Sequence, residues 1–205
     1  HYINKVMRIK IGQEIFITNG QGSLWKAIKI ENNLIQLNQQ DKPFLFKEKE
    51  KFLLGIAVVI PKNGFEDIVK MCTEIGIDFI QPLSSERQVK KKSNFSEKTL
   101  RWNSIINEAV EQSERLWRPC ILNRVNLIDW INSRDSKDII SISVTRENSS
   151  ENLNSWLKKS QNLLDKKNGV LWNVIGPEGG WSKSEIEFFI KNKIPFVKLS
   201  KNILR

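Results

Sequence analysis

The residues best suited to chemistry form a short loop with almost no side-chain bulk, Gly176-Pro177-Glu178-Gly179-Gly180. The loop follows an apolar run, Val170 to Ile175, whose composition is typical of a strand buried on both faces. Ser182 and Glu185 then match a capping box, which predicts that a helix begins at once. Backbone amides exposed between a strand and a helix often bind small ligands in open α/β sheets. We therefore predict a cofactor loop, with an ordinary tight turn as the alternative.

The spacing of the glycines excludes two nucleotide sites. It does not match Gly-x-Gly-x-x-Gly, and no Gly-Lys-Ser or Gly-Lys-Thr follows, so neither the dinucleotide fingerprint nor the phosphate-binding loop is present. A nucleotide-dependent dehydrogenase is thereby disfavoured. The helix that follows the loop carries Ile186, Phe189 and Ile190 on one stripe, which predicts an apolar face packed on the sheet.

The composition indicates a polyanionic partner. Lysine and arginine number 33 against 23 aspartates and glutamates, a formal charge of +10, and nucleic acid is the usual partner of such a chain. Cys72 and Cys120 lie far apart without metal-ligand spacing, which predicts reduced thiols in the core, no metal and a cytoplasmic location. No apolar run approaches the roughly 20 residues of a membrane span, so we expect no membrane association.

The hydrophobic pattern divides the chain into two domains. Residues 1–49 alternate in the manner of strands and predict a small β meander or barrel. Residues 50–205 alternate strands with helices, which predicts a mostly parallel sheet. The expected strands are 14–18, 24–30 and 34–37 in the first domain and 53–60, 78–83, 139–144, 170–175 and 196–199 in the second. The expected helices are 65–75, 97–113, 153–164 and 184–191.

Two segments carry the charge that binding to RNA requires. Residues 84–93 form a basic polar loop, which either contacts phosphate or is simply exposed. The long helix after it has a buried face made of Trp102, Ile105, Ile106 and Ala109. Beside that face runs a polar stripe of Arg101, Glu108, Gln112 and Arg115. The stripe is either plain solvent surface or one wall of an RNA cleft, completed by the basic loop and Arg118.

Several motifs in order resemble one known family. The matching motifs are residues 70–76 (Lys-Met-Cys-Thr-Glu-Ile-Gly), Ser85-Glu86-Arg87, Arg101-Trp102, residues 108–115 (Glu-Ala-Val-Glu-Gln-Ser-Glu-Arg), Ile175 to Gly180, and residues 199–205 (Leu-Ser-Lys-Asn-Ile-Leu-Arg). Together they closely resemble the 16S ribosomal RNA uridine-N3 methyltransferases of the SPOUT, or trefoil-knotted, class. The match spans nearly the whole chain, and residues 1–8 resemble the family's His-x-x-x-x-Val-Leu-Arg segment.

The resemblance implies an α/β fold with a SPOUT-type knotted, mostly parallel sheet, helices on both faces, and a small N-terminal PUA-like barrel. It implies a homodimer that uses S-adenosylmethionine and acts on 16S rRNA or the small ribosomal subunit. The methyl donor would lie among Val144, Thr145, Ile175, Gly176, Pro177, Glu178, Gly179, Gly180, Leu199, Ser200, Asn202, Ile203 and Leu204. The residues expected to bind RNA are Arg8, Arg87, Lys90, Lys91, Lys92, Arg101, Gln112, Arg115 and Arg118.

The chain departs from the family's pattern at its two ends. Ser200 and Asn202 stand where a Leu-Gly-x-Arg-Ile-Leu-Arg pattern has Gly and Arg, so the third donor loop is expected to differ in shape and charge. The first residue is His1 rather than methionine, and the family's Thr-Glu-Thr-Ala helix does not follow Arg205. We therefore expect that residues precede His1. Either residues after Arg205 supply the helix that completes the knot, or this form does not close its donor site.

The chemistry implied by the resemblance sets a requirement at N3 of uridine, which is not nucleophilic until its proton is lost. Arg205 or Arg115 could stabilise charge on the uracil oxygens, or could clamp a phosphate. The proton acceptor is expected to be a carboxylate or water, and Glu178 is the candidate carboxylate, with a structural role near a helix N-terminus as the alternative. A ribose 2′-O methyltransferase and a non-catalytic RNA-binding protein remain the competing functions.

Overall fold

The structure, a computed structural model, describes residues 2–39, 42–88, 95–145, 150–167 and 169–200. The chain forms two compact units. The first comprises His1–Lys49 with Glu114–Arg118, and the second comprises Glu50–Ser113 with Pro119–Arg205. The segment Glu114–Arg118, which the sequence analysis assigned to the second domain, therefore lies in the first unit.

The first unit is a small antiparallel sheet preceded by a π-helical turn, Tyr2–Val6. Its strands are β1 (Glu14–Thr18), β2 (Ser23–Glu31), β3 (Leu34–Leu37) and β4 (Leu45–Phe46), and β2 pairs with each of the other strands. The prediction of β1, β2 and β3 is confirmed. The segment Glu114–Arg118 joins this sheet through the indole of Trp117, which donates a hydrogen bond to the Lys47 carbonyl at 2.8 Å.

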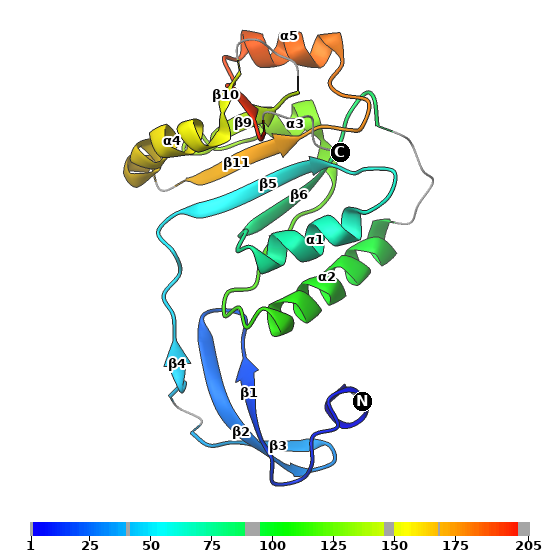
Figure 1. Cartoon of the computed structure of the whole chain (residues 1–205), viewed down its shortest axis with the longest axis vertical. Coiled ribbons are helices and arrows are strands. Elements are labelled where there is room, and N and C mark those ends of the chain that lie inside the picture. Colours follow the sequence, from blue (N-terminus) through cyan, green and yellow to red (C-terminus); the bar gives the residue numbers. More distant parts are fainter. Residues whose placement is uncertain (1, 40–41, 89–94, 146–149, 168, 201–205) are drawn as a thin grey trace. The chain divides into compact units, whose positions relative to one another are not determined.

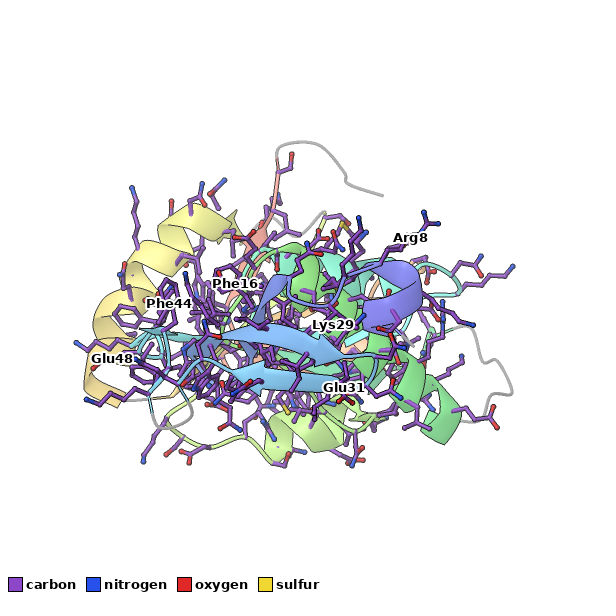
Figure 2. All side chains as sticks on the ribbon, turned by 90° about the horizontal axis from the view of Figure 1, so that it is seen from below. Arg8, Phe16, Lys29, Glu31, Phe44 and Glu48 are labelled. Carbon is purple, nitrogen blue, oxygen red and sulfur yellow. The ribbon has the colours of Figure 1, made fainter. Side chains whose placement is uncertain are left out.

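Figure 2 shows where Phe16, Phe44, Lys29 and Arg8 lie in the first unit. The rings of Phe16 and Phe44 lie side by side with centroids 5.9 Å apart, and the Lys26 ammonium sits 4.5 Å from the Phe44 ring. Lys29 is buried and donates a hydrogen bond from Nζ to the Ile9 carbonyl at 2.6 Å. Arg8 is exposed and has a positive φ of 52°.

The second unit is built on a parallel sheet in the order β10-β12-β9-β11-β5-β6-β7, with β8 also paired to β6. Its strands are β5 (Leu53–Val59), β6 (Phe79–Ser84), β7 (Cys120–Ile121), β8 (Val125–Asn126), β9 (Ile139–Ser143), β10 (Glu151–Asn152), β11 (Val170–Ile175) and β12 (Phe196–Lys198). The helices are α1 (Phe65–Glu74), α2 (Phe95–Gln112), α3 (Leu127–Asn132), α4 (Leu153–Lys167) and α5 (Lys183–Lys191). The predicted parallel α/β fold is confirmed.

Helices cover both faces of this sheet (Figure 1). Side chains of α1 and α2 pack with Val58 and Ile80 on one face. Side chains of α3 and α5 pack on the other face, around Trp172 and Val174. Successive residues of a strand point to opposite faces, so the continuous apolar run of β11 serves both layers, as the sequence predicts.

Two details of the expected core are wrong. Ile190 of α5 is 60% exposed, whereas Phe189 beside it is fully buried, so the apolar stripe of the helix is narrower than its spacing suggests. Cys120 is also exposed, because it lies in the two-residue edge strand β7. Cys72 is buried as expected.

The two cysteines should differ sharply in reactivity. Burial raises the pKa of the Cys72 thiol from 9.0 to about 11, so this group stays protonated at pH 8 and only a small fraction is the reactive thiolate. Iodoacetamide at pH 8 should therefore label Cys120 in the folded protein and leave Cys72 unmodified, as measured by peptide mass spectrometry. Labelling of both residues at equal rates under native conditions would show that the face beneath α1 is open to solvent.

Candidate functional site

Three of the segments expected to hold the methyl donor lie at one edge of the sheet. Val144-Thr145 follows β9, Ile175–Gly180 begins at the last residue of β11, and Leu199-Ser200 follows β12. These strands are neighbours in the order β12-β9-β11 and run parallel, so their carboxyl ends meet at the same edge. A hydrogen bond of 3.0 Å from Val144 N–H to the Val197 carbonyl ties the first segment to β12, the strand that precedes the third. Asn202, Ile203, Leu204 and Arg205 lie outside the described residues.

The predicted capping box is present at the start of α5. Ser182 accepts a hydrogen bond of 3.1 Å from Glu185 N–H, and the Glu185 carboxylate accepts one of 2.8 Å from Ser182 N–H. Glu185 is 2% exposed, so its carboxyl oxygens depend on hydrogen bonds from the protein in place of water. Its second oxygen accepts a further bond of 3.2 Å from Glu86 N–H, which joins the helix to the segment after β6.

The glycine-rich loop, residues 176–180, is tied to the ends of neighbouring strands. Glu178 Oε1 accepts a hydrogen bond of 2.8 Å from Lys62 N–H in the loop after β5. The Gly179 carbonyl accepts one of 3.2 Å from Arg87 Nη1, after β6. Trp181, directly after the loop, donates from Nε1 to the Ser143 carbonyl of β9 at 3.0 Å. The loop is thus fixed through segments far from it in the sequence.

Gly176 and Gly180 meet separate requirements of the loop. A Cβ atom at Gly176 would lie 2.9 Å from two carbons of the Trp181 ring, so the indole packs where a side chain would be. Gly180 has a φ of +68°, a conformation that favours glycine. Gly179 is different: its Cβ would meet Arg87 at 3.7 Å, an ordinary contact. Residues 178–180 are exposed, and neither glycine carries a side chain that would cover its main chain.

Glu86 completes the network at the start of α5. Both of its carboxylate oxygens accept hydrogen bonds from Ser184 Oγ at 2.9 Å, and Ser184 in turn lies 2.7 Å from Ser182 Oγ. Hydrogen bonds from Ser182 and Ser184 lower the pKa of the Glu86 carboxyl below its ordinary 4.5. The carboxylate is therefore ionised at neutral pH. The stability that these hydrogen bonds give to the folded protein is lost only as the pH falls through that lowered pKa.

The side chains expected to bind RNA do not form one described cluster. Arg87 contacts the glycine-rich loop, whereas Arg101 of α2 pairs with Glu66 of α1, with Nε 3.1 Å from Oε1. Gln112 is exposed at the last residue of α2. Because α2 ends there, Arg115 is not on the helical stripe as expected; it lies with Arg8 and Arg118 in the first unit. Lys90, Lys91 and Lys92 lie outside the described residues.

The contacts that hold the loop were not predicted from the sequence. Lys62, Ser143 and Ser184 were not singled out, and Glu86 was noted only as part of a motif. Glu178 and Lys62 are 116 residues apart, and Arg87 and Gly179 are 92 apart, so no spacing could reveal these pairs. The available signal was the capping box, which places Glu185 where its carboxylate can accept more than one N–H.

Two further properties concern the described residues only. They include no group of three or more His, Cys, Asp or Glu side chains placed to hold a metal ion. In the same part of the chain, no helix combines the length and apolar character that crossing a bilayer requires.

Family profiles match most of the chain. Residues 48–205 match a family described as RNA methyltransferase domain, and residues 1–31 match one described as RNA methyltransferase PUA domain. A ribosomal RNA small subunit methyltransferase E from Synechocystis is 32% identical over all of this chain, which spans 65% of that relative. A ribosomal RNA small subunit methyltransferase E 2 from Borreliella burgdorferi is 30% identical, and the chain spans 82% of it.

Solved structures share the fold. A ribosomal RNA small subunit methyltransferase E from Neisseria gonorrhoeae, crystallised with S-adenosyl methionine, superposes with a TM-score of 0.80 at 22% identity, over 100% of this chain and 81% of that one. A putative methyltransferase from Legionella pneumophila, solved with its cofactor SAM bound, gives 0.82 at 20% identity, with the same coverage. The parallel sheet and the small antiparallel unit are therefore those of a SPOUT-type RNA methyltransferase with a PUA-like domain. Within that class, the chain belongs to the ribosomal RNA small subunit methyltransferase E family.

Proposed function

We propose that the protein transfers the methyl group of S-adenosylmethionine to N3 of a uridine in 16S rRNA. Support for the enzyme class comes from the family, whose members are named as small-subunit rRNA methyltransferases. The observation that carries the site is the exposed, glycine-rich main chain at residues 178–180, held at the carboxyl edge of the sheet by strand ends on both sides. The choice of N3 rests on the motifs shared with the uridine-N3 methyltransferases.

The described residues fit a cofactor with an adenosine group. Adenine presents ring nitrogens and an amino group, which backbone N–H and C=O groups can pair with where no side chain intervenes. The Gly179 carbonyl already accepts from Arg87 and the Gly180 N–H already donates to the Pro177 carbonyl, so the groups proposed to pair with adenine here are the Gly179 N–H and the Gly180 carbonyl. Val144-Thr145 and Leu199-Ser200 lie at the same edge. The proposed donor site therefore consists of these three segments. When bound, S-adenosylmethionine supplies a methyl group on a positively charged sulfur that a nucleophile can displace.

The residues of the chain must prepare the uracil ring for this transfer. The N3 proton has to leave, and the negative charge that then spreads over O2 and O4 has to be stabilised. Glu178 remains the proposed proton acceptor, although its Oε1 is already engaged by Lys62 N–H, which also fits a structural role. Arg205 remains the proposed partner for the uracil oxygens or for phosphate, and Arg115, in the first unit, remains a proposed phosphate contact.

The proposal extends to the assembly. By the family resemblance, we propose that the protein works as a homodimer on 16S rRNA or the small ribosomal subunit, in the cytoplasm. The formal charge of +10 supports a nucleic-acid partner, because lysine and arginine neutralise phosphate and release its counterions.

Nucleoside analysis tests the proposed reaction. Small ribosomal subunits from cells that lack the enzyme should be incubated with the protein and methyl-labelled S-adenosylmethionine, and the digested rRNA analysed by mass spectrometry. The expected product is N3-methyluridine. Label on a ribose 2′-hydroxyl would assign the protein to the competing class of methyltransferase. Binding of rRNA without any transfer of label, together with no heat on titration with S-adenosylhomocysteine, would leave only the RNA-binding function.

A further inference from the structure

The segment after β6 has a defined place beside the glycine-rich loop. Its residues 85–88 form a turn closed by a hydrogen bond of 3.3 Å from Gln88 N–H to the Ser85 carbonyl. We call these residues, Ser85-Glu86-Arg87-Gln88, the β6–α2 turn. The Gln88 amide anchors it by donating to the Ile60 carbonyl at 2.8 Å and accepting from Arg124 Nη2 at 3.1 Å. The turn is therefore fixed to the end of β5 independently of the glycine-rich loop.

The β6–α2 turn contacts both the glycine-rich loop and the first turn of α5, which follows the loop. Arg87 donates to the Gly179 carbonyl inside the loop, at 3.2 Å. The Glu86 carboxylate accepts a hydrogen bond of 2.9 Å from the Ser184 hydroxyl, and the Glu86 backbone N–H donates one of 3.2 Å to the buried Glu185 carboxylate. Both partners lie in the first turn of α5. The loop and the helix start are thus braced by one neighbouring turn.

These contacts matter because the glycines of the loop have no side chains whose packing could fix its shape. Within the loop, Gly180 N–H donates a hydrogen bond to the Pro177 carbonyl at 2.9 Å. Glycine-rich main chain has high conformational entropy, and a ligand that binds it must bear the cost of ordering it. A loop already held in its bound shape binds more tightly, since less ordering remains to be done.

We propose that Arg87 and Glu86 are positioning residues for the methyl-donor loop, and that they set its affinity for S-adenosylmethionine even when no RNA is present. The proposal rests on the proposed function, which places the donor at this loop. It gives Arg87 a role different from the RNA contact expected from the sequence, because its guanidinium donates to the loop's own carbonyl.

Titration calorimetry with S-adenosylhomocysteine, in the absence of RNA, tests this role. Arg87→Met removes the donor but keeps the length of the side chain, and should weaken binding roughly three- to tenfold, the usual range for one hydrogen bond. Arg87→Lys keeps a donor and should recover most of the affinity. Glu86→Ala should weaken binding similarly, whereas Glu86→Gln keeps an oxygen for the Ser184 hydroxyl and should bind nearly as the wild type does. Lys191→Met, an exposed change at the far end of α5, is the charge-matched control and should leave affinity unchanged.

Steady-state kinetics provide the second measurement. The variants should raise KM for S-adenosylmethionine and leave kcat at saturating donor close to wild type, because positioning affects binding of the donor. If a variant also lowers the melting temperature, Ser184→Ala, which deletes a single exposed hydroxyl, should still weaken binding roughly two- to fivefold at an intact fold.

The possible failures are distinct. Wild-type protein that binds no S-adenosylhomocysteine would overturn the proposed function itself. Wild-type binding with unchanged affinity in Arg87→Met, Glu86→Ala and Ser184→Ala would overturn only the positioning role. Arg87→Met that loses affinity for rRNA alone, with full affinity for S-adenosylhomocysteine, would restore Arg87 to a simple RNA contact.

Discussion

Replacing Gly176 by alanine should weaken binding of S-adenosylhomocysteine by about tenfold or more and lower the melting temperature. The new Cβ would lie 2.9 Å from the Trp181 ring, and the contact is with the rigid part of the indole. Movement of the Trp181 side chain would break two contacts. Its Nε1 donates a hydrogen bond to the Ser143 carbonyl, and its ring packs edge-on against Phe189 at a centroid distance of 5.2 Å. Overpacking of this kind costs about 1–3 kcal/mol of folding stability. If the loop shifts to relieve the contact, the ligand must restore its shape on binding, and each 1.4 kcal/mol of that cost is about a factor of ten in affinity.

Two other substitutions make this prediction specific. Gly179→Val should also reduce donor affinity, because a side chain there would stand between the exposed main chain and the cofactor. Since the Cβ of residue 179 has ordinary contacts, the melting temperature should change much less than for Gly176→Ala. Lys183→Ala, at an exposed position beside the loop, should leave both quantities within experimental error. Full donor affinity in both glycine variants would show that the donor binds elsewhere.

Replacing Gly55 by alanine should destabilise the second unit by about 1–3 kcal/mol or more. Gly55 of β5 pairs directly with Trp172 of β11, and a Cβ at residue 55 would collide with the indole ring. The ring is 1% exposed, lies edge-on to Trp130 at 5.1 Å, and donates from Nε1 to Asp138 at 3.2 Å, so it has no alternative position. Urea unfolding should show a lower midpoint for Gly55→Ala.

A double substitution tests the cause of that loss. Trp172→Leu alone should cost about 3–5 kcal/mol or somewhat less, because it leaves a cavity between the sheet and α3. Combined with Gly55→Ala, the added methyl group then fills part of that cavity. The double variant should therefore be more stable than the sum of the two single effects predicts, by at least about 0.5 kcal/mol. Strict additivity of the two stability losses would mean that the Trp172 indole is not what restricts residue 55 to glycine.

The regular elements of the fold could be predicted because each has a local signal. The run Val170 to Ile175 is a strand buried on both faces, and Ser182 with Glu185 defines the start of α5. The strands β7 and β8 have two residues each and the helix α3 has six, too few for a periodic pattern, so this part of the sheet was missed. Trp130, buried in the core from α3, was missed with it.

The candidate site was only partly predictable for a different reason. The composition of residues 176–180 shows low side-chain bulk and predicts a cofactor loop, but it does not show what holds the loop in place. The three ties come from Lys62, Arg87 and Ser143, which reach the loop because β5, β6 and β9 end at the same edge. Their meeting depends on strand order, which the sequence pattern does not contain. Because the sequence does not show this strand order, it also did not show that Arg87 contacts the loop, and Arg87 was predicted to bind RNA.

Hydrogen–deuterium exchange of backbone amides, with and without S-adenosylhomocysteine, is the most direct test that the donor binds this main chain. With the ligand bound, we expect slower exchange for the amides of Gly176, Glu178, Gly179 and Gly180 and of Val144-Thr145, with α1 and α2 unchanged. Binding by calorimetry without any protection in residues 176–180 would contradict it.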